Sequence, residues 1–181
     1  MSDDSILALL VEDNPGDARL IKEALAEIGR PRFRLEWAEN LGKAREILTQ
    51  RQFAVILLDL SLPDSQGMDT VRRIEQAAPN TPVVILTGLD DEALAVEAVR
   101  SGAQDYLVKN DITPHLLTRV VRYAIERQLI SESLRASEAR LSALFENMSS
   151  GVAVYQADRD GQEFIFSAFN QAAERLDQIS R

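Results

Sequence analysis

The sequence alternates short β-rich runs with runs of helical period, and it does so five times between Ile6 and about Arg127. The β-rich runs are residues 6–11, 33–37, 54–58, 83–86 and 105–108. The segments between them carry apolar residues three or four positions apart, with Gly, Pro or Asn near an end. This alternation predicts a parallel sheet with helices on both faces, because each right-handed crossover has to pass back over the sheet.

The apolar content of each run predicts its place in the sheet. Runs 6–11, 54–58 and 83–86 are almost continuously apolar, as expected of central strands that are buried on both faces. Run 33–37 alternates apolar and polar residues and is expected at an edge. We therefore predict an α/β protein with a doubly wound, flavodoxin-like, five-stranded parallel sheet of strand order 2-1-3-4-5.

Composition excludes several classes of protein. The formal net charge of -9 repels a phosphate backbone, so nucleic acid is not an expected partner. The chain has no cysteine, which rules out disulfides and thiolate metal sites. The N-terminus is acidic and no apolar run approaches the length of a membrane span, so we expect a cytoplasmic protein without membrane insertion.

The rhythm changes after Thr113. Positions spaced by alternating fours and threes from 116 to 148 are mostly apolar, and no proline occurs from His115 to Arg181. A second apolar line, Leu117, Val121 and Ala124, can dock on the sheet. We expect one long helix that leaves the domain as a linker and pairs with a second copy as a parallel homodimer through residues 116–148. A helix that ends near Gln128 and folds back is the alternative.

The last part of the chain reads as strand, turn, strand and helix, with Asp160 and Gly161 as the turn. Two strands and one helix are marginally stable alone, so we expect a fragment of a larger domain. The predicted organisation is a domain at 1–127, a helical linker at 128–147 and a truncated segment at 148–181.

Carboxylates gather at the predicted carboxyl ends of the strands, where doubly wound sheets bind ligands. Glu12 and Asp13 follow the first run, and Asp59 follows the third. If these strands are neighbours, three carboxylates converge. An all-oxygen cluster of this kind suits Mg²⁺.

Two further groups indicate phosphoryl chemistry. Thr87 ends the fourth run and Lys109 follows the fifth, so a hydroxyl and an ammonium stand beside the carboxylates. Asp59 is then the nucleophile that forms an acyl phosphate. Singly, Glu12 or Asp13 could cap a helix, Thr87 could belong to a turn and Lys109 could be a solvated charge; it is their conjunction that favours the site.

The motifs LLVEDN, LLDLSLPDSQG, ILTG and GAQDYLVK occur in this order. Over residues 5 to about 127 they resemble the receiver domain of response regulators in two-component signalling. The resemblance implies a signalling phosphoacceptor, rather than a conventional enzyme, that catalyses its own phosphorylation and dephosphorylation. Its phosphoryl donor would be a phosphohistidine on a sensor histidine kinase or a phosphotransfer protein.

The resemblance also implies a role for each site residue. Asp59 accepts the phosphoryl group, while Asp13, Asp59 and the Ser61 carbonyl bind Mg²⁺ directly and Glu12 binds it through water. Thr87, the Gly88 amide and Lys109 hold the phosphoryl oxygens, and Tyr106 is the aromatic switch. Without a phosphoryl group, Tyr106 is expected as a half-buried edge aromatic. Asn110 stands where the family usually has proline, which leaves the shape of the loop at Lys109 open.

The tail from about Leu141 resembles the opening of a PAS sensor domain, which implies a longer parent protein with a kinase or cyclic-dinucleotide output. The alternative is that the chain is the regulatory part of a hybrid histidine kinase. An aspartyl-phosphate hydrolase of the haloacid-dehalogenase type needs a second Asp where Ser61 stands. The only histidine, His115, lacks the acidic neighbour of a phosphoaccepting histidine, and no phosphate-cradling loop for a flavin follows the first strand.

Overall fold

The computed structural model describes residues 5–29, 32–88, 92–157 and 164–177. The chain divides into two compact units, Met1–Leu129 and Ile130–Arg181.

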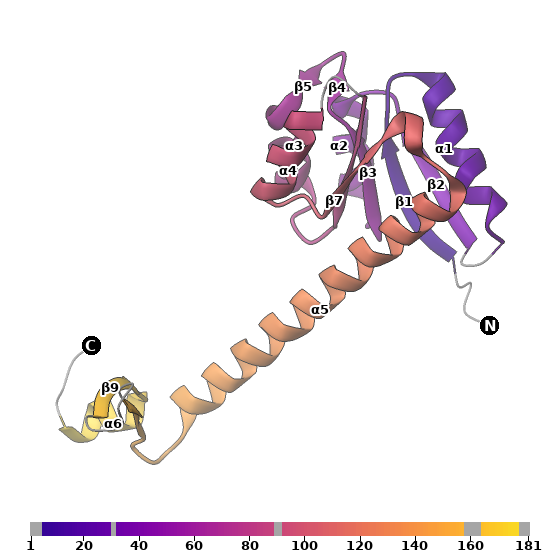
Figure 1. Cartoon of the computed structure of the whole chain (residues 1–181). Coiled ribbons are helices and arrows are strands. Elements are labelled where there is room, and N and C mark those ends of the chain that lie inside the picture. The colour runs from indigo at the N-terminus through magenta and orange to yellow at the C-terminus, as the bar shows by residue number, and fades with distance from the viewer. Residues whose placement is uncertain (1–4, 30–31, 89–91, 158–163, 178–181) are drawn as a thin grey trace. The chain divides into compact units, whose positions relative to one another are not determined.

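The first unit is built on a five-stranded parallel sheet (Figure 1). Its strands are β1 (Ser5–Val11), β2 (Arg32–Ala38), β3 (Val55–Asp59), β6 (Val83–Thr87) and β7 (Asp105–Val108). Their order is β2-β1-β3-β6-β7, with every neighbouring pair parallel. Counted along the sheet-forming strands, this is the predicted order 2-1-3-4-5, which is confirmed. The alternating strand β2 lies at an edge, as its pattern predicted.

Helices cover both faces of this sheet. They are α1 (Pro15–Glu27), α2 (Leu41–Gln50), α3 (Gly67–Ala77), α4 (Glu92–Ser101) and the first part of α5 (Pro114–Asn147). Buried apolar residues of α2, α3 and α4 pack on one face with Leu9 and Val11. Those of α1 and α5 pack on the other face with Ala8 and Leu10. Successive residues of β1 therefore enter opposite cores, which explains why its run is apolar without alternation.

The loop after β3 contains an element that the sequence did not predict. Strands β4 (Ser61–Leu62) and β5 (Ser65–Gln66) form an antiparallel pair. Gly67 then begins α3 with a φ of 57°, a left-handed conformation that glycine adopts without steric cost. Its amide donates to the Leu60 carbonyl at 2.8 Å, which closes the loop directly beyond Asp59.

Helix α5 runs without interruption from Pro114 to Asn147, so the continuous helix is confirmed and a break near Gln128 is wrong. Leu117, Val121 and Ala124 are buried against the sheet, as predicted. Val120, which the pairing seam includes, is also buried in this core. No helix in the described part of the chain carries an apolar stretch that could cross a bilayer.

The second unit contains an antiparallel pair, β8 (Ala153–Ala157) and β9 (Phe164–Phe169), followed by α6 (Gln171–Asp177). The predicted sequence of strand, strand and helix is confirmed. The predicted turn at Asp160 and Gly161 lies outside the described residues. Asn170 joins the parts of this unit: its buried side chain accepts from the amides of Val152 and Ala173 and donates to the Ser150 carbonyl.

Candidate functional site

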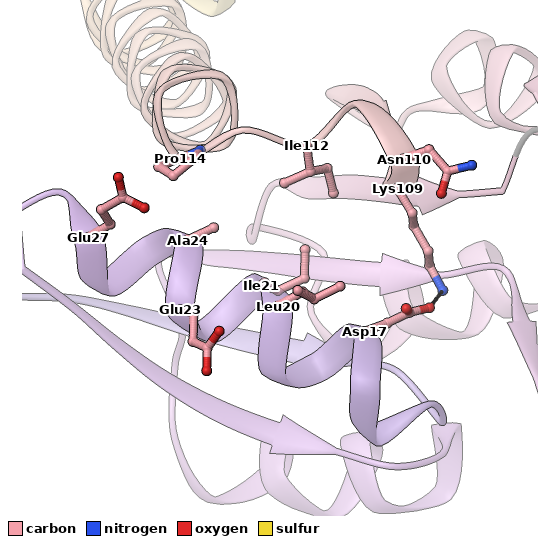
Figure 2. A pocket seen from close by; sticks show the side chains of 10 residues that line it. All are labelled: Asp17, Leu20, Ile21, Glu23, Ala24, Glu27, Lys109, Asn110, Ile112 and Pro114. Atoms are coloured by element: carbon pink, nitrogen blue, oxygen red, sulfur yellow. Dashed lines mark hydrogen bonds and ion pairs between the residues drawn. The ribbon is translucent and has the colours of Figure 1, made fainter.

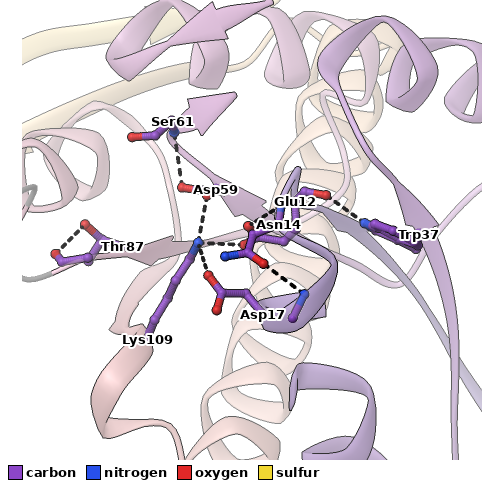
Figure 3. Close-up of polar contacts among 10 residues, drawn as sticks. Glu12, Asn14, Asp17, Trp37, Asp59, Ser61, Thr87 and Lys109 are labelled. Carbon is purple, nitrogen blue, oxygen red and sulfur yellow. Dashed lines mark hydrogen bonds and ion pairs between the residues drawn. The ribbon is translucent and has the colours of Figure 1, made fainter. Parts of the chain in front are cut away.

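The residues predicted to form a site follow the carboxyl ends of neighbouring strands. Asp59 is the last residue of β3 and Thr87 the last of β6, while Glu12 comes directly after β1 and Lys109 directly after β7. β1 pairs with β3 in a register that sets Val11 opposite Leu58. Since all these strands run in the same direction, their ends meet at a single edge of the sheet (Figure 3).

Three carboxylates converge at this edge. Glu12, Asp13 and Asp59 each offer an oxygen atom, and these atoms lie within 4.8 Å of one another. Glu12 and Asp59 are buried, whereas Asp13 is exposed. The predicted convergence is confirmed. Its all-oxygen donor set fits Mg²⁺, which prefers carboxylates and keeps several waters.

Lys109 lies among the carboxylates. Its Nζ is 2.7 Å from Asp59 Oδ2, 2.7 Å from Glu12 Oε2 and 3.0 Å from Asp17 Oδ2 (Figure 3). The lysine begins a short 3₁₀ helix, Lys109–Asp111. With Asn110 in place of proline, this loop still directs the ammonium into the site, which answers the question that the sequence left open.

The pKa values of Glu12 and Lys109 reflect this crowding. Burial raises the pKa of Glu12 to about 7, the charge of Asp59 adds to this rise, and the attraction of Lys109 opposes it. Burial alone would lower the pKa of Lys109, but its contacts with Asp59 and Glu12 outweigh burial and raise that pKa. Lys109 is therefore a permanent cation in the site.

One oxygen of Glu12 is left short of hydrogen bonds. Oε1 accepts from the Asn14 amide at 3.1 Å. Oε2 is buried and has the ion pair with Lys109, but it receives no hydrogen bond of good geometry from the described residues. A buried oxygen with unused acceptor capacity is a further reason why the cluster fits a hydrated cation.

The remaining predicted residues lie around this cluster. The Ser61 amide donates to Asp59 Oδ1 at 3.1 Å, while a metal-binding role for the Ser61 carbonyl stays a prediction. The buried Thr87 hydroxyl donates to the Gly88 carbonyl at 3.1 Å. Tyr106 is half-buried and packs against the core beneath α2, α3 and α4. The structure thus brings Glu12, Asp13, Asp59 and Lys109 together and engages Thr87 elsewhere.

Neither Glu12 nor Asp13 is the N-cap of helix α1. Its N-cap is Asn14, whose side chain accepts from the Gly16 amide at 2.9 Å. Glu12 and Asp13 are therefore not needed as caps and their carboxylates face the site.

Two residues of the site were not predicted from the sequence. Asp17, in the first turn of α1, contacts Lys109. Trp37, in β2, donates its indole N–H to the Glu12 carbonyl at 2.7 Å. Asp17 follows Asp13 by only four residues and lies in the first turn of α1, so its closeness to Asp13 in the sequence is the available signal. No comparable signal in the sequence connects Trp37 to Glu12.

A comparison with known families agrees with this geometry. The sequence model of the response regulator receiver domain matches residues 8–121. The chain belongs to the response regulator receiver domain family. Domains of this family are the receivers of response regulators in two-component signalling, and they typically bind Mg²⁺ in an acidic pocket.

Individual relatives match the receiver part of the chain. The response regulator protein PilR of Pseudomonas aeruginosa is 37% identical over 102 residues, which cover 56% of this chain and 22% of PilR. The photosynthetic apparatus regulatory protein RegA of Rhodovulum sulfidophilum is 36% identical over 114 residues, which cover 61% of each chain. The chain thus spans less than two thirds of the length of these relatives.

A solved structure supports the same fold. A response regulator receiver domain protein from Clostridium thermocellum is 28% identical to this chain and superposes with a TM-score of 0.61. The superposition covers 69% of this chain and 98% of that one.

Proposed function

We propose that the receiver accepts a phosphoryl group on Asp59 from the phosphohistidine of a sensor histidine kinase or a phosphotransfer protein. The observation that carries the proposal is the position of Asp59. It is buried at the end of β3, within 4.8 Å of two other carboxylates and 2.7 Å from the ammonium of Lys109. A buried carboxylate in such a setting is poised for reaction with an anion, because the ammonium of Lys109, together with Mg²⁺ when it is bound, offsets the charge of both.

The transfer is a displacement at phosphorus. One oxygen of the Asp59 carboxylate forms a bond to phosphorus while the bond from phosphorus to the imidazole nitrogen of the donor breaks, and the nitrogen keeps the electron pair. Lys109, the Thr87 hydroxyl and the Gly88 amide hold the phosphoryl oxygens. Mg²⁺, held by Glu12, Asp13, Asp59 and the Ser61 carbonyl, supplies charge neutralisation when bound.

Reorientation of the Thr87 hydroxyl starts the conformational change that follows phosphorylation. This hydroxyl donates to the Gly88 carbonyl in the present structure, and the same hydroxyl can donate to a phosphoryl oxygen on Asp59 only after it reorients. The movement vacates space that the ring of Tyr106 takes up. Phosphorylation then biases a two-state equilibrium at the face formed by α4, β7 and α5.

Intact-protein mass spectrometry tests phosphorylation of Asp59. After incubation with Mg²⁺ and acetyl phosphate, wild type should gain one phosphoryl group, and Asp59→Ala should gain none. Asp69→Ala, which removes an exposed carboxylate of α3 that pairs with Arg73, is the matched control and should behave as wild type. An unmodified wild type, or an adduct that persists in Asp59→Ala, would refute the proposal. An aspartyl-phosphate hydrolase is disfavoured because Ser61 replaces its second Asp.

We also propose that α5 pairs with α5 of a second copy in a parallel dimer. The predicted seam spans 116–148. Because Val120 is buried in the receiver core, the proposal rests on the later positions. Exposed apolar side chains recur there with the spacing of a coiled coil: Ile130, Leu134, Leu141 and Leu144. A second copy can bury these side chains, because it presents the same apolar residues in the same register.

Sedimentation equilibrium tests this pairing. Wild type should sediment as a dimer, while Leu134→Glu, which places a charge in the seam, should be monomeric. Leu20→Glu, which changes an exposed leucine of α1, should remain dimeric. A wild type that stays monomeric at high concentration would remove the coiled linker.

We further propose that residues 148–181 begin a PAS domain, which the receiver controls through the linker at 128–147, either in a response regulator or in a hybrid histidine kinase. The antiparallel pair β8 and β9, with α6 after it, supports this. Hydrogen exchange at the amides of β8 and β9 should change when beryllofluoride occupies the receiver. Unchanged exchange in the second unit would contradict control by the receiver.

A further inference from the structure

Asp17 lies where α1 meets the site. It is in the first turn of the helix, and its Oδ2 accepts a hydrogen bond from Lys109 Nζ at 3.0 Å. Both residues lie at the edge of a groove of about 440 Å³ between α1 and the segment from Lys109 to Pro114 (Figure 2). Figure 2 shows the contact between them at one end of this groove. Asp17 therefore belongs to the surroundings of Lys109 and also to the surface of the protein.

The ammonium of Lys109 donates hydrogen bonds to Asp59 and Asp17 and forms an ion pair with Glu12. A lysine ammonium has three N–H donors and no acceptor, and Lys109 is surrounded by the carboxylates of Asp59, Glu12 and Asp17. A phosphoryl group on Asp59 brings new oxygens that need one of these donors. The ammonium has to move toward these oxygens, which stretches its present contacts with the carboxylates.

The cost of breaking a contact differs among the three carboxylates. The Glu12 side chain is 0% exposed, so an ammonium withdrawn from it leaves a charge that water cannot reach. Asp59 is 7% exposed and carries the phosphoryl group itself, so an ammonium that binds the phosphoryl oxygens stays beside it. The Asp17 side chain is 32% exposed, so water can replace the ammonium there. The contact with Asp17 is therefore the one that breaks at least cost.

We infer that Asp17 is a positioning residue that competes with the phosphoryl group for Lys109. In the unphosphorylated receiver it holds the ammonium toward α1, and it releases the ammonium when Asp59 is modified. Asp17 thus lowers the affinity of the site for a phosphoryl group without touching that group. The inference rests on the proposed function, because it needs a phosphoryl group on Asp59.

Other acidic residues of the groove provide the contrast. Glu23 accepts from Arg19 Nε at 2.8 Å within α1. Glu27 is exposed and lies at the other end of α1, nearly three helical turns beyond Asp17. Among the groove-lining carboxylates that the structure describes, Asp17 alone contacts Lys109.

Beryllofluoride, a phosphoryl mimic, tests the competition. Its affinity is measured by fluorine NMR at saturating Mg²⁺ in wild type, Asp17→Asn and Glu27→Gln. Both variants remove one negative charge from the groove, but only Asp17→Asn removes the ion pair with Lys109. Asp17→Asn should bind about five-fold more tightly than wild type, equivalent to one net hydrogen bond, and Glu27→Gln should match wild type within about two-fold.

Two further measurements separate release of Lys109 from weaker charge repulsion. The gain in Asp17→Asn should persist at about 0.5 M salt, because salt screens a distant charge more than a direct contact. Asp17→Glu, which restores a carboxylate within reach of Lys109, should return the affinity toward wild type. The inference would be overturned if the gain in affinity of Asp17→Asn were lost in high salt, or if Asp17→Glu bound beryllofluoride as tightly as Asp17→Asn.

The remaining outcomes are also decisive. Asp17→Asn that binds no more tightly than Glu27→Gln, or more weakly than wild type, overturns the competition while leaving phosphorylation of Asp59 intact. A wild type that neither binds beryllofluoride nor is phosphorylated refutes the proposed function itself, and the role of Asp17 falls with it.

Discussion

The ammonium nitrogen of Lys109 lies 2.7 Å from Oδ2 of Asp59, although the two residues are 50 positions apart in the chain. Asp59 ends β3 and Lys109 follows β7, and β6 lies between these two strands. The lysine side chain therefore reaches across the end of β6, where Thr87 stands. A group attached to Asp59 would lie between the ammonium and this hydroxyl, which is the arrangement that phosphoryl transfer requires.

Replacement of this lysine should separate phosphoryl transfer from metal binding. Lys109→Met keeps the length of the side chain but removes its charge and its donors. Phosphorylation by acetyl phosphate should slow by roughly 100-fold, the usual effect of losing one donor to the developing charge. Mg²⁺ should bind at least as tightly as in wild type, because the ammonium no longer competes for Glu12 and Asp59. Mass spectrometry gives the rate, and calorimetry gives the affinity.

Lys43→Met is the control for this change. Lys43 is an exposed lysine whose ion pair with Glu46 lies within one turn of α2. It should alter neither the rate nor the affinity for Mg²⁺. A Lys109→Met variant that is phosphorylated as fast as wild type would show that the ammonium does not hold the phosphoryl oxygens.

Asp64 should make the stability of the receiver depend on pH. Its carboxylate accepts from the amides of Leu41 at 2.9 Å and Gly42 at 2.8 Å, so the loop after β3 caps the start of α2. Burial opposes ionisation, but the hydrogen bonds from the two amides together outweigh it and lower the pKa of Asp64. A lowered pKa in the folded state stabilises the fold above the ordinary value of 3.8, and this contribution is lost as pH falls through the lowered pKa.

Asp64→Asn should therefore be less stable than wild type by about 0.5–1 kcal/mol at neutral pH, the usual range for a charge at a helix N-terminus. The difference should shrink as pH falls below 3.8. Urea unfolding at several pH values measures it. Glu39→Gln removes an exposed charge just before α2 and should have the smaller effect. A difference between wild type and Asp64→Asn that stays constant across this pH range would contradict the role of the charge.

Much of this fold could be predicted because the pattern of apolar residues in each strand indicates whether one or both of its faces are buried. Continuous apolar runs become the central strands β1, β3 and β6, and the alternating run becomes the edge strand β2. The pair β4 and β5 could not be predicted, since two-residue strands carry no periodicity. Their position depends instead on the bond from Gly67 to Leu60 and on the contacts of Asp64 with α2, which link residues distant in sequence.

The site, like the fold, has residues that could be predicted from the sequence and residues that could not. Strand ends placed Glu12, Asp13, Asp59 and Lys109 together, because parallel neighbours end at one edge. Asp17 and Trp37 were missed because their roles depend on side-chain reach from α1 and from β2. Thr87 was placed correctly at its strand end, but the direction of its hydroxyl toward Gly88 is a rotamer choice that no sequence pattern encodes.

Trp37 should report on the metal site. It is the only tryptophan of the chain, and its indole N–H donates to the Glu12 carbonyl at 2.7 Å. Mg²⁺ at the carboxylates changes the electric field at this carbonyl, so the emission of Trp37 should change as Mg²⁺ is added. The midpoint of the change should equal the dissociation constant found by calorimetry. Emission that is unaffected at saturating Mg²⁺ would contradict the coupling.

Removal of the indole N–H of Trp37 should destabilise the fold and weaken Mg²⁺ binding, because Glu12 loses a hydrogen bond to its carbonyl. Trp37→Phe keeps an aromatic side chain on β2 but cannot donate to Glu12. The free energy of unfolding should fall by about 1 kcal/mol, the net value of one hydrogen bond. The affinity for Mg²⁺ should fall with it, as measured by calorimetry. Phe33→Leu, a change on the same edge strand, is the control and should leave the affinity for Mg²⁺ unaltered.

Asn170 should hold the second unit together independently of the receiver. Its buried amide group accepts from the Val152 and Ala173 amides and donates to the Ser150 carbonyl. Asn170→Asp keeps the acceptors, but it loses the donor and buries a charge, so we expect a loss of about 2 kcal/mol. Hydrogen exchange at Val152 and Ala173 should then be about 30-fold faster, while phosphorylation of Asp59 should be unchanged. Gln171→Glu makes the same chemical change at an exposed neighbour and should leave the exchange rates as they are; equal effects of both variants would contradict the role of Asn170.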